Sequence, residues 1–143
     1  MRYANDMPTD SHQLARSVAR LNRRLRQERQ TDLTPTQLSV LGSILKLGPS
    51  TPSAIAAYER VQPPSITRTL NCLVDDGLAL RKPHPDDGRQ VIISISDKGE
   101  AVLAEERDRR DQWLTQRLRE LSAPERKTLR EAAVLLEQLA DSE

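Results

Sequence analysis

The sequence predicts a mainly helical fold of the α+β class with one small β-hairpin. Aromatic residues make up 2% of the 143 residues and Phe is absent. The core must therefore be built from Leu, Ile, Val and Ala, which suit helices better than a β-sandwich. In several segments the apolar residues recur three and four positions apart, the spacing of one helix face, whereas residues 78–96 contain two short runs typical of strands. With 36% apolar residues, a chain of this length is able to bury one core.

Helices are predicted from apolar periodicity and from capping signals. Leu14, Val18 and Leu21 follow one another at spacings of four and three, which favours an amphipathic N-terminal helix. Thr34-Pro35-Thr36-Gln37 combines a cap residue, a proline at the first helical position and a Gln three residues after the cap. Similar signals stand at residues 51–53 and 122–125. The predicted helices cover residues 10–30, 35 to about 48, a short segment from 52, residues 63–76, a long segment from 97 and a last one from 123.

The centre of the chain predicts a helix followed by two strands. Pro63 and Pro64 fit the first turn of a helix, where backbone N–H groups have no intrahelical acceptor. Gly77 is a natural stop for that helix. Strands are then predicted over residues 78–82 and 90–96, with a turn-rich tip over residues 84–88.

The helix over residues 63–76 has one apolar side and one polar side. At about 100° per residue, Ile66, Leu70, Leu73 and Val74 share one side. Because a short helix and a tight turn precede it, we interpret the pair as a helix-turn-helix, whose second helix enters the major groove of DNA with its N-terminal half. The candidate DNA-contacting residues of this helix are Pro64, Ser65, Thr67, Arg68 and Asn71.

Each candidate has a chemistry that suits DNA. The guanidinium of Arg68 is able to hold a guanine bidentately, and the amide of Asn71 is able to pair with an adenine. The hydroxyls of Ser65 and Thr67 suit phosphates or either base edge. A polar helix face is also what a merely solvated helix shows, so the order of short helix, turn, helix and hairpin carries the interpretation.

The predicted hairpin tip carries Arg89, which fits the negative potential of a minor groove. Asp87, two residues earlier, is placed to hold that side chain. The alternative is a surface arginine that pairs with Asp86 or Asp87, and the two roles are compatible.

Several classes of function are excluded by composition. No run of some 18 apolar residues exists and the N-terminus lacks an apolar signal core, so we expect a cytoplasmic protein without membrane contact. Cys72 is the single cysteine, and with only His12 and His84 beside it there is no zinc-ligand spacing, so no metal is expected. Nucleophile, base and phosphate-loop constellations are missing too, and we expect no enzymatic activity and no cofactor.

The net charge of +1 is low for a DNA-binding protein, but the charge is unevenly distributed. Residues 1–30 carry a net charge of +4, residues 31–96 are neutral and residues 97–143 carry −3. If the acidic C-terminal third lies away from the duplex, the near-neutral total does not oppose DNA binding.

The chain resembles the MarR family of bacterial transcription regulators. The resemblance rests on Ser65-x-x-Arg68, Leu70-x-x-Leu73, Gly77-Leu78, Asp87-x-Arg89 and Ser94-x-Ser96-x-x-Gly99, and covers nearly the whole chain. It implies a winged helix-turn-helix over residues 34–96, flanked by dimerisation helices over residues 1–33 and 97–143, in one compact domain. It also implies a homodimeric repressor on a pseudo-palindromic operator, with recognition-helix positions Ser65, Thr67, Arg68 and Asn71 and a wing-tip arginine at Arg89.

The same resemblance implies release from DNA by a small aromatic or phenolic inducer. Two departures bear on regulation. The redox-sensing branch of the family typically carries a reactive cysteine in the N-terminal helix, where this chain has none, and Cys72 is expected to be a passive residue, although a cation nearby would favour a reactive thiol. Aromatic residues for a ligand pocket are few, and Trp113 is expected in the core or the dimer interface rather than in a ligand wall.

Dimerisation has its own physical argument. The apolar stripe of the first helix and those near the C-terminus have no sheet to cover them within one small chain, so a second copy is the simplest partner. The alternative function is a winged-helix protein-interaction module without sequence-specific DNA binding. Arg68 and Arg89 separate the two functions, because only DNA binding requires both.

Overall fold

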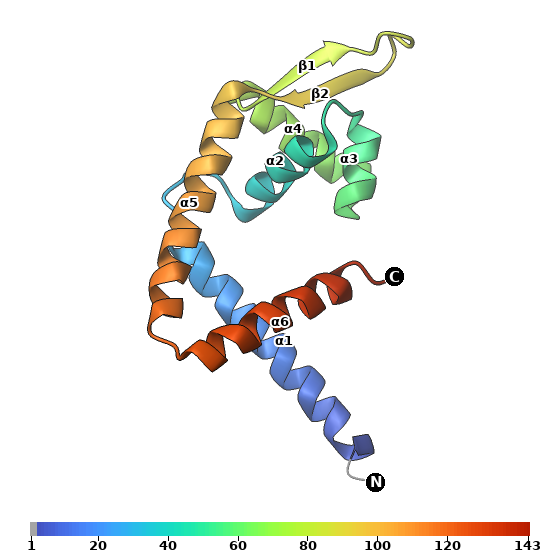
Figure 1. The fold of residues 1–143 in the computed structure, drawn as a ribbon. Coiled ribbons are helices and arrows are strands. Elements are labelled where there is room, and N and C mark those ends of the chain that lie inside the picture. Colours follow the sequence, from blue (N-terminus) through green and yellow to red (C-terminus); the bar gives the residue numbers. More distant parts are fainter. Residues whose placement is uncertain (1–2) are drawn as a thin grey trace. The chain divides into compact units, whose positions relative to one another are not determined.

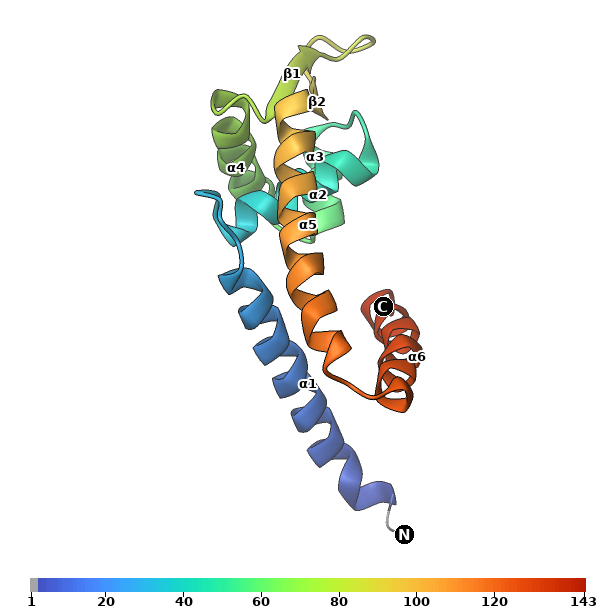
Figure 2. The same ribbon diagram turned by 60° about the vertical axis from the view of Figure 1, so that its left-hand side comes forward.

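The computed structural model describes the backbone of residues 3–143 and the side chains of residues 9–143. It confirms the predicted class, with helices throughout and one two-stranded antiparallel sheet (Figures 1 and 2). The elements are α1 (Tyr3–Gln27), α2 (Pro35–Leu47), α3 (Pro52–Glu59), α4 (Pro63–Asp75), β1 (Ala79–Pro83), β2 (Val91–Ile95), α5 (Asp97–Arg119) and α6 (Ala123–Ala140).

Capping groups define the starts of three helices, as the sequence predicts. The Thr34 hydroxyl accepts a hydrogen bond from the N–H of Gln37 at 3.1 Å, and the Gln37 side chain accepts one from the N–H of Thr34 at 2.9 Å. Ser122 and Glu125 form the same reciprocal box at α6, and Thr51 caps α3. The hydrogen bond from the backbone N–H of Ser122, with a further contribution from its side chain, lowers the pKa of the Glu125 carboxyl.

The N-terminal helix begins earlier than the sequence predicts. α1 starts at Tyr3, whereas the prediction places its start near residue 10, and it ends at Gln27 rather than at residue 30. The apolar periodicity behind the prediction begins at Leu14, so it holds no information about the polar turns before that residue.

The chain forms two compact units. One contains residues 1–28 and 109–143, and the other contains residues 29–108. The second unit contains α2, α3, α4, both strands and the first half of α5, and it has a buried apolar core. The core consists of Val40, Leu41, Ile44, Ile55, Ala56, Ile66, Leu70, Leu73, Leu78, Ala79 and Ile93.

A Schellman motif ends α4 where the sequence predicts a stop. Gly77 has a φ of +75°, a conformation that residues with a side chain rarely adopt. Its N–H donates to the carbonyl of Val74 at 3.0 Å, and the N–H of Leu78 donates to that of Leu73 at 2.9 Å. The chain therefore reverses directly into β1.

The hairpin pairs β1 with β2 in antiparallel register, with Ala79 opposite Ile95 and Pro83 opposite Val91. Each strand lies within one residue of its predicted bounds. One pairing is not predicted: Ser50, in the α2–α3 connection, exchanges two backbone hydrogen bonds with Ile93, at 2.8 and 3.0 Å. This bridge ties the start of the helix-turn-helix to the hairpin.

The first turn of α5 is joined to the end of α4. The Ser96 hydroxyl donates to the carbonyl of Gly77 at 2.6 Å, and Lys98 Nζ donates to that of Asp76 at 2.9 Å. Gly99 packs so closely that a Cβ there would lie 2.2 Å from the carbonyl oxygen of Leu78. Only glycine fits this position.

The unit of residues 1–28 and 109–143 exposes apolar side chains. On α1, Leu14, Val18 and Leu21 are 45–47% exposed, and on α6 Leu136 and Leu139 are 40% and 59% exposed. All of these except Leu21, together with small residues of both helices, line one open groove. Within the described residues, no helix is long and apolar enough to cross a membrane.

We predict opposite stability effects for alanine at two glycines. Gly99→Ala should lower the free energy of unfolding by about 1–3 kcal/mol, because its Cβ meets a backbone carbonyl. Gly42→Ala, within α2 with no atom inside 4 Å of the new Cβ, should raise it by roughly 0.5–1 kcal/mol. Urea denaturation of both variants checks this, and equal midpoints for Gly99→Ala and the parent would contradict it.

Candidate nucleic-acid interface

Burial of one face of α4 fixes which of its side chains meet solvent. Ile66, Leu70 and Leu73 are at most 2% exposed, and Val74 is partly buried against the same core. This agrees with the apolar side expected from the sequence. All candidate recognition residues lie outside that side and are exposed, namely Pro64, Ser65, Thr67, Arg68 and Asn71.

The N-terminus of α4 offers no free backbone N–H group. Pro63 and Pro64 have none, and the N–H groups of Ser65 and Ile66 both donate to the carbonyl of Gln62, at 3.1 and 3.4 Å. Gln62 makes no side-chain cap. Contacts to an anion at this end must therefore come from side chains.

Hydroxyls on α4 are partly used within the helix. Thr67 Oγ1 donates to the carbonyl of Pro63 at 3.0 Å, and Thr69 Oγ1 donates to that of Ser65 at 3.2 Å. In this arrangement the Thr67 hydroxyl keeps only its lone pairs for an outside partner, and the residue as a whole is exposed. The Ser65 hydroxyl, in contrast, donates no hydrogen bond within the described residues, so its proton remains available to an outside acceptor.

Arg68 is exposed and makes no hydrogen bond or ion pair within residues 9–143. Its five N–H donors are thus unengaged by the chain itself. Cys72, one helical turn further on, is also exposed.

Asn71 is connected to the hairpin. Arg81, on β1, donates a guanidinium hydrogen bond to Asn71 Oδ1. Sequence reasoning misses Arg81, because the contact joins residues of two elements and depends on how β1 packs beside α4.

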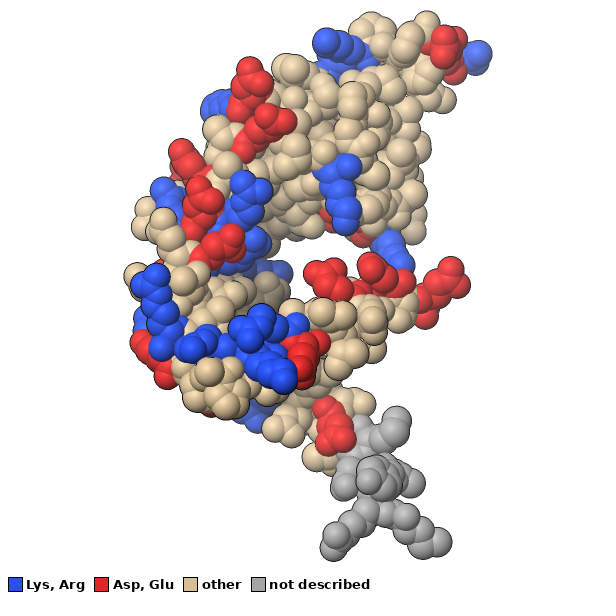
Figure 3. Space-filling model, in the orientation of Figure 1, with Lys and Arg blue, Asp and Glu red and all other residues tan. Residues whose placement is uncertain are grey.

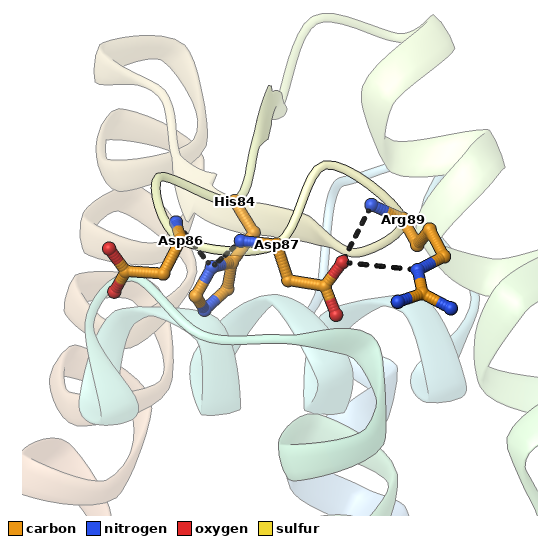
Figure 4. A network of polar contacts seen from close by, with 4 residues as sticks. All are labelled: His84, Asp86, Asp87 and Arg89. Carbon is orange, nitrogen blue, oxygen red and sulfur yellow. Dashed lines mark hydrogen bonds and ion pairs between the residues drawn. The ribbon is translucent and has the colours of Figure 1, made fainter.

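The hairpin tip is held by short-range bonds (Figure 4). Asp87 Oδ1 accepts from the N–H of Arg89 at 3.0 Å and lies 3.5 Å from its Nε. The predicted pairing of Asp87 with Arg89 is therefore present. The Arg89 side chain is nevertheless 94% exposed, so the pairing orients it without covering it.

His84 closes the other half of the tip, a role that sequence reasoning misses. Its Nδ1 accepts from the N–H of Asp86 at 3.0 Å and from that of Asp87 at 3.1 Å, as the dashed lines in Figure 4 show. Two bonds to one nitrogen require that nitrogen to be unprotonated. Figure 3 shows acidic and basic side chains together at the tip of the hairpin.

The chain contains in order a short helix, a turn, a helix with an exposed polar face and an arginine-tipped hairpin. This arrangement defines a winged helix-turn-helix, a fold typical of DNA-binding proteins. Comparison with known proteins identifies the family. The profile of the MarR family matches residues 33–91. The chain belongs to the MarR family and is a transcriptional regulator rather than an enzyme.

Individual relatives agree over nearly the full length. An HTH-type transcriptional regulator of Mycobacterium leprae is 43% identical over 129 residues, which is 90% of both chains. A transcriptional regulator structure from Pseudomonas aeruginosa has a TM-score of 0.85 and 36% identity, covering 97% of this chain and 98% of that one. A mutant MarR from E. coli, solved in complex with operator DNA, has a TM-score of 0.64 and 30% identity, covering 88% of this chain and 92% of that one.

Two substitutions at Asp87 test the bonds of the hairpin tip. Asp87→Ala should speed amide hydrogen exchange at Arg89 by up to about tenfold, because one charge-assisted acceptor is lost at an exposed site. Asp87→Asn keeps an acceptor oxygen and should leave this rate within about twofold. Equal exchange rates for the alanine variant and the parent would show that the bond does not order the tip.

Proposed function

We propose that the protein is a sequence-specific repressor that binds a pseudo-palindromic operator as a homodimer. The observation that carries this is the exposed polar face of α4, with Arg68 free of internal partners, beside a hairpin that holds Arg89 outward. The relative solved with operator DNA supports the same use of the fold.

Apart from Asn71, each site residue has a proposed part. Arg68 reads a guanine in the major groove, where its two terminal nitrogens match O6 and N7. Ser65 donates to a phosphate, and the methyl group of Thr67 suits a thymine. Arg89 enters the minor groove, with Asp87 limiting its orientations. Pro64 fixes the path of the chain at the helix start and contacts the sugar-phosphate edge.

Homodimerisation is proposed from the apolar surfaces of α1 and α6. Side chains such as Leu14, Val18 and Leu139 are about half exposed in one chain, and a two-fold partner would cover them with the same surface. A two-fold axis would place two recognition helices on one DNA face, roughly 34 Å apart.

An effector is part of the proposal. By its resemblance to the family, a small aromatic or phenolic molecule should release the protein from its operator. Any such molecule must bind the form with lower DNA affinity more tightly, since only differential affinity shifts the equilibrium. Loss of operator binding on addition of a phenolic compound, with no loss on addition of a non-aromatic carboxylate, would support this.

We predict that Arg68 and Arg89 contribute differently to DNA binding. Fluorescence anisotropy with the DNA upstream of the gene and with a scrambled duplex, over a salt series, measures both. Arg68→Ala should cost about 1–3 kcal/mol of specific affinity and reduce the ratio between the two duplexes. Arg89→Ala should weaken binding to both duplexes more evenly and make the negative slope of log K against log salt shallower by about 1.

Arg119→Ala is the matched control, because it removes one exposed arginine at the end of α5, outside the unit of residues 29–108, here called the winged helix unit. It should leave both affinities within about twofold. An unchanged duplex ratio for Arg68→Ala would contradict base reading by this residue. Equal weak binding of the parent protein to every operator-like duplex would instead favour a protein-interaction module.

A charge in the apolar groove should dissociate the dimer. Leu139→Glu places a carboxylate among the groove residues of α1 and α6, and sedimentation velocity should show a monomer at micromolar concentration. Gln138→Glu adds the same charge one position away, outside the residues that line the groove, and should remain dimeric. A dimeric Leu139→Glu variant would place the interface elsewhere.

A further inference from the structure

The hydrogen bond between Arg81 and Asn71 determines how the Asn71 amide is presented. A guanidinium has donors only, so the amide atom that it contacts must be the oxygen Oδ1. The amide nitrogen, with its two donors, then remains for an outside partner. The orientation of the Asn71 amide is thus set by the neighbouring strand and not by its own helix.

The charge of Arg81 is not neutralised nearby. Within the described residues Arg81 forms no ion pair, and its contact to Asn71 is to a neutral amide. The other residues lining the hollow in which the two side chains meet are Pro52, Thr67, Leu70, Val91 and Ile93, none of them acidic. Arg68 lies one helical turn before Asn71 on the same polar side. The amide oxygen of Asn71 thus faces the guanidinium of Arg81, with Arg68 one turn before it and Asp75 one turn after it on α4.

We infer that Arg81 makes Asn71 a reader of guanine instead of adenine, an inference that rests on the proposed DNA-binding function. Bidentate pairing with adenine needs Oδ1 to accept from the N6 amino group while the amide nitrogen donates to N7. Here Oδ1 already accepts from a guanidinium, and an incoming N6 amino group would approach a second donor and a positive charge. Guanine presents two acceptors, O6 and N7. The N–H groups of the Asn71 amide can donate to them, and the nearby positive charge of Arg81 attracts them.

Arg81 is accordingly a positioning residue for specificity. It sets the preference of Asn71 through the orientation and charge of its surroundings. An isolated asparagine on a recognition helix would be expected to prefer adenine, whereas Asn71 beside Arg81 prefers guanine.

Selection of bound sequences from a randomised duplex library tests the inference with the full-length protein. Asn71→Ala first identifies the half-site position that Asn71 reads, as the position where base preference disappears. At that position the parent protein should prefer guanine over adenine by about tenfold. Arg81→Met keeps the aliphatic stem but removes the donors and the charge, and the preference should change to adenine.

Two further variants separate orientation from general electrostatics and from folding. Arg81→Lys retains a cationic donor and should keep the guanine preference, even if its affinity is lower. Lys82→Met removes the same charge from the neighbouring position of β1 and should lower affinity without changing the preferred base. Thermal unfolding of each variant shows whether it remains folded.

The outcomes are distinct. Adenine preference in the parent protein, guanine preference retained in Arg81→Met, or no position lost in Asn71→Ala would each overturn the inference while leaving the proposed function intact. If the parent protein enriched no sequence at all, the proposed function itself would fail and the inference with it.

Discussion

The winged helix unit depends on the burial of one face of α4. Ile66, Leu70 and Leu73 are almost fully removed from water, and each contributes about 1.5–3 kcal/mol through that burial. The same contacts fix the rotation of the helix about its own axis. Because that rotation is fixed by the core, the residues that face solvent are fixed too, and Arg68 needs no stabilising contact of its own. The core contacts and the exposed side chains proposed to contact DNA thus lie on opposite sides of one short helix.

Local signals made most of the fold predictable. The starts of α2, α3 and α6 follow from Thr34, Thr51 and Ser122, because a capping hydroxyl and the amide it bonds lie three residues apart in the sequence. The end of α4 follows from Gly77, because a glycine just past a helix readily adopts the left-handed conformation that stops it. The start of α1 was predicted wrongly, because polar residues before Leu14 carry no periodicity.

The site was predictable in part, and the division again follows sequence distance. The pairing of Asp87 with Arg89 spans two residues and was expected, whereas the bond between Arg81 and Asn71 spans ten and was not. The bridge between Ser50 and Ile93 spans still more. Contacts of this second kind depend on how β1 and β2 pack beside α4, which no local pattern determines. They alter the chemistry of predicted residues without changing which residues are exposed.

The tight packing at Gly99 makes the junction of α4 and α5 a stiff joint. The first turn of α5 is bonded to the carbonyls of Asp76 and Gly77 and lies against that of Leu78 without room for one methyl group. There is no slack for α5 to pivot while the end of α4 stays still. Within the unit of residues 29–108, the first turn of α5 and the end of α4 are therefore held as one piece.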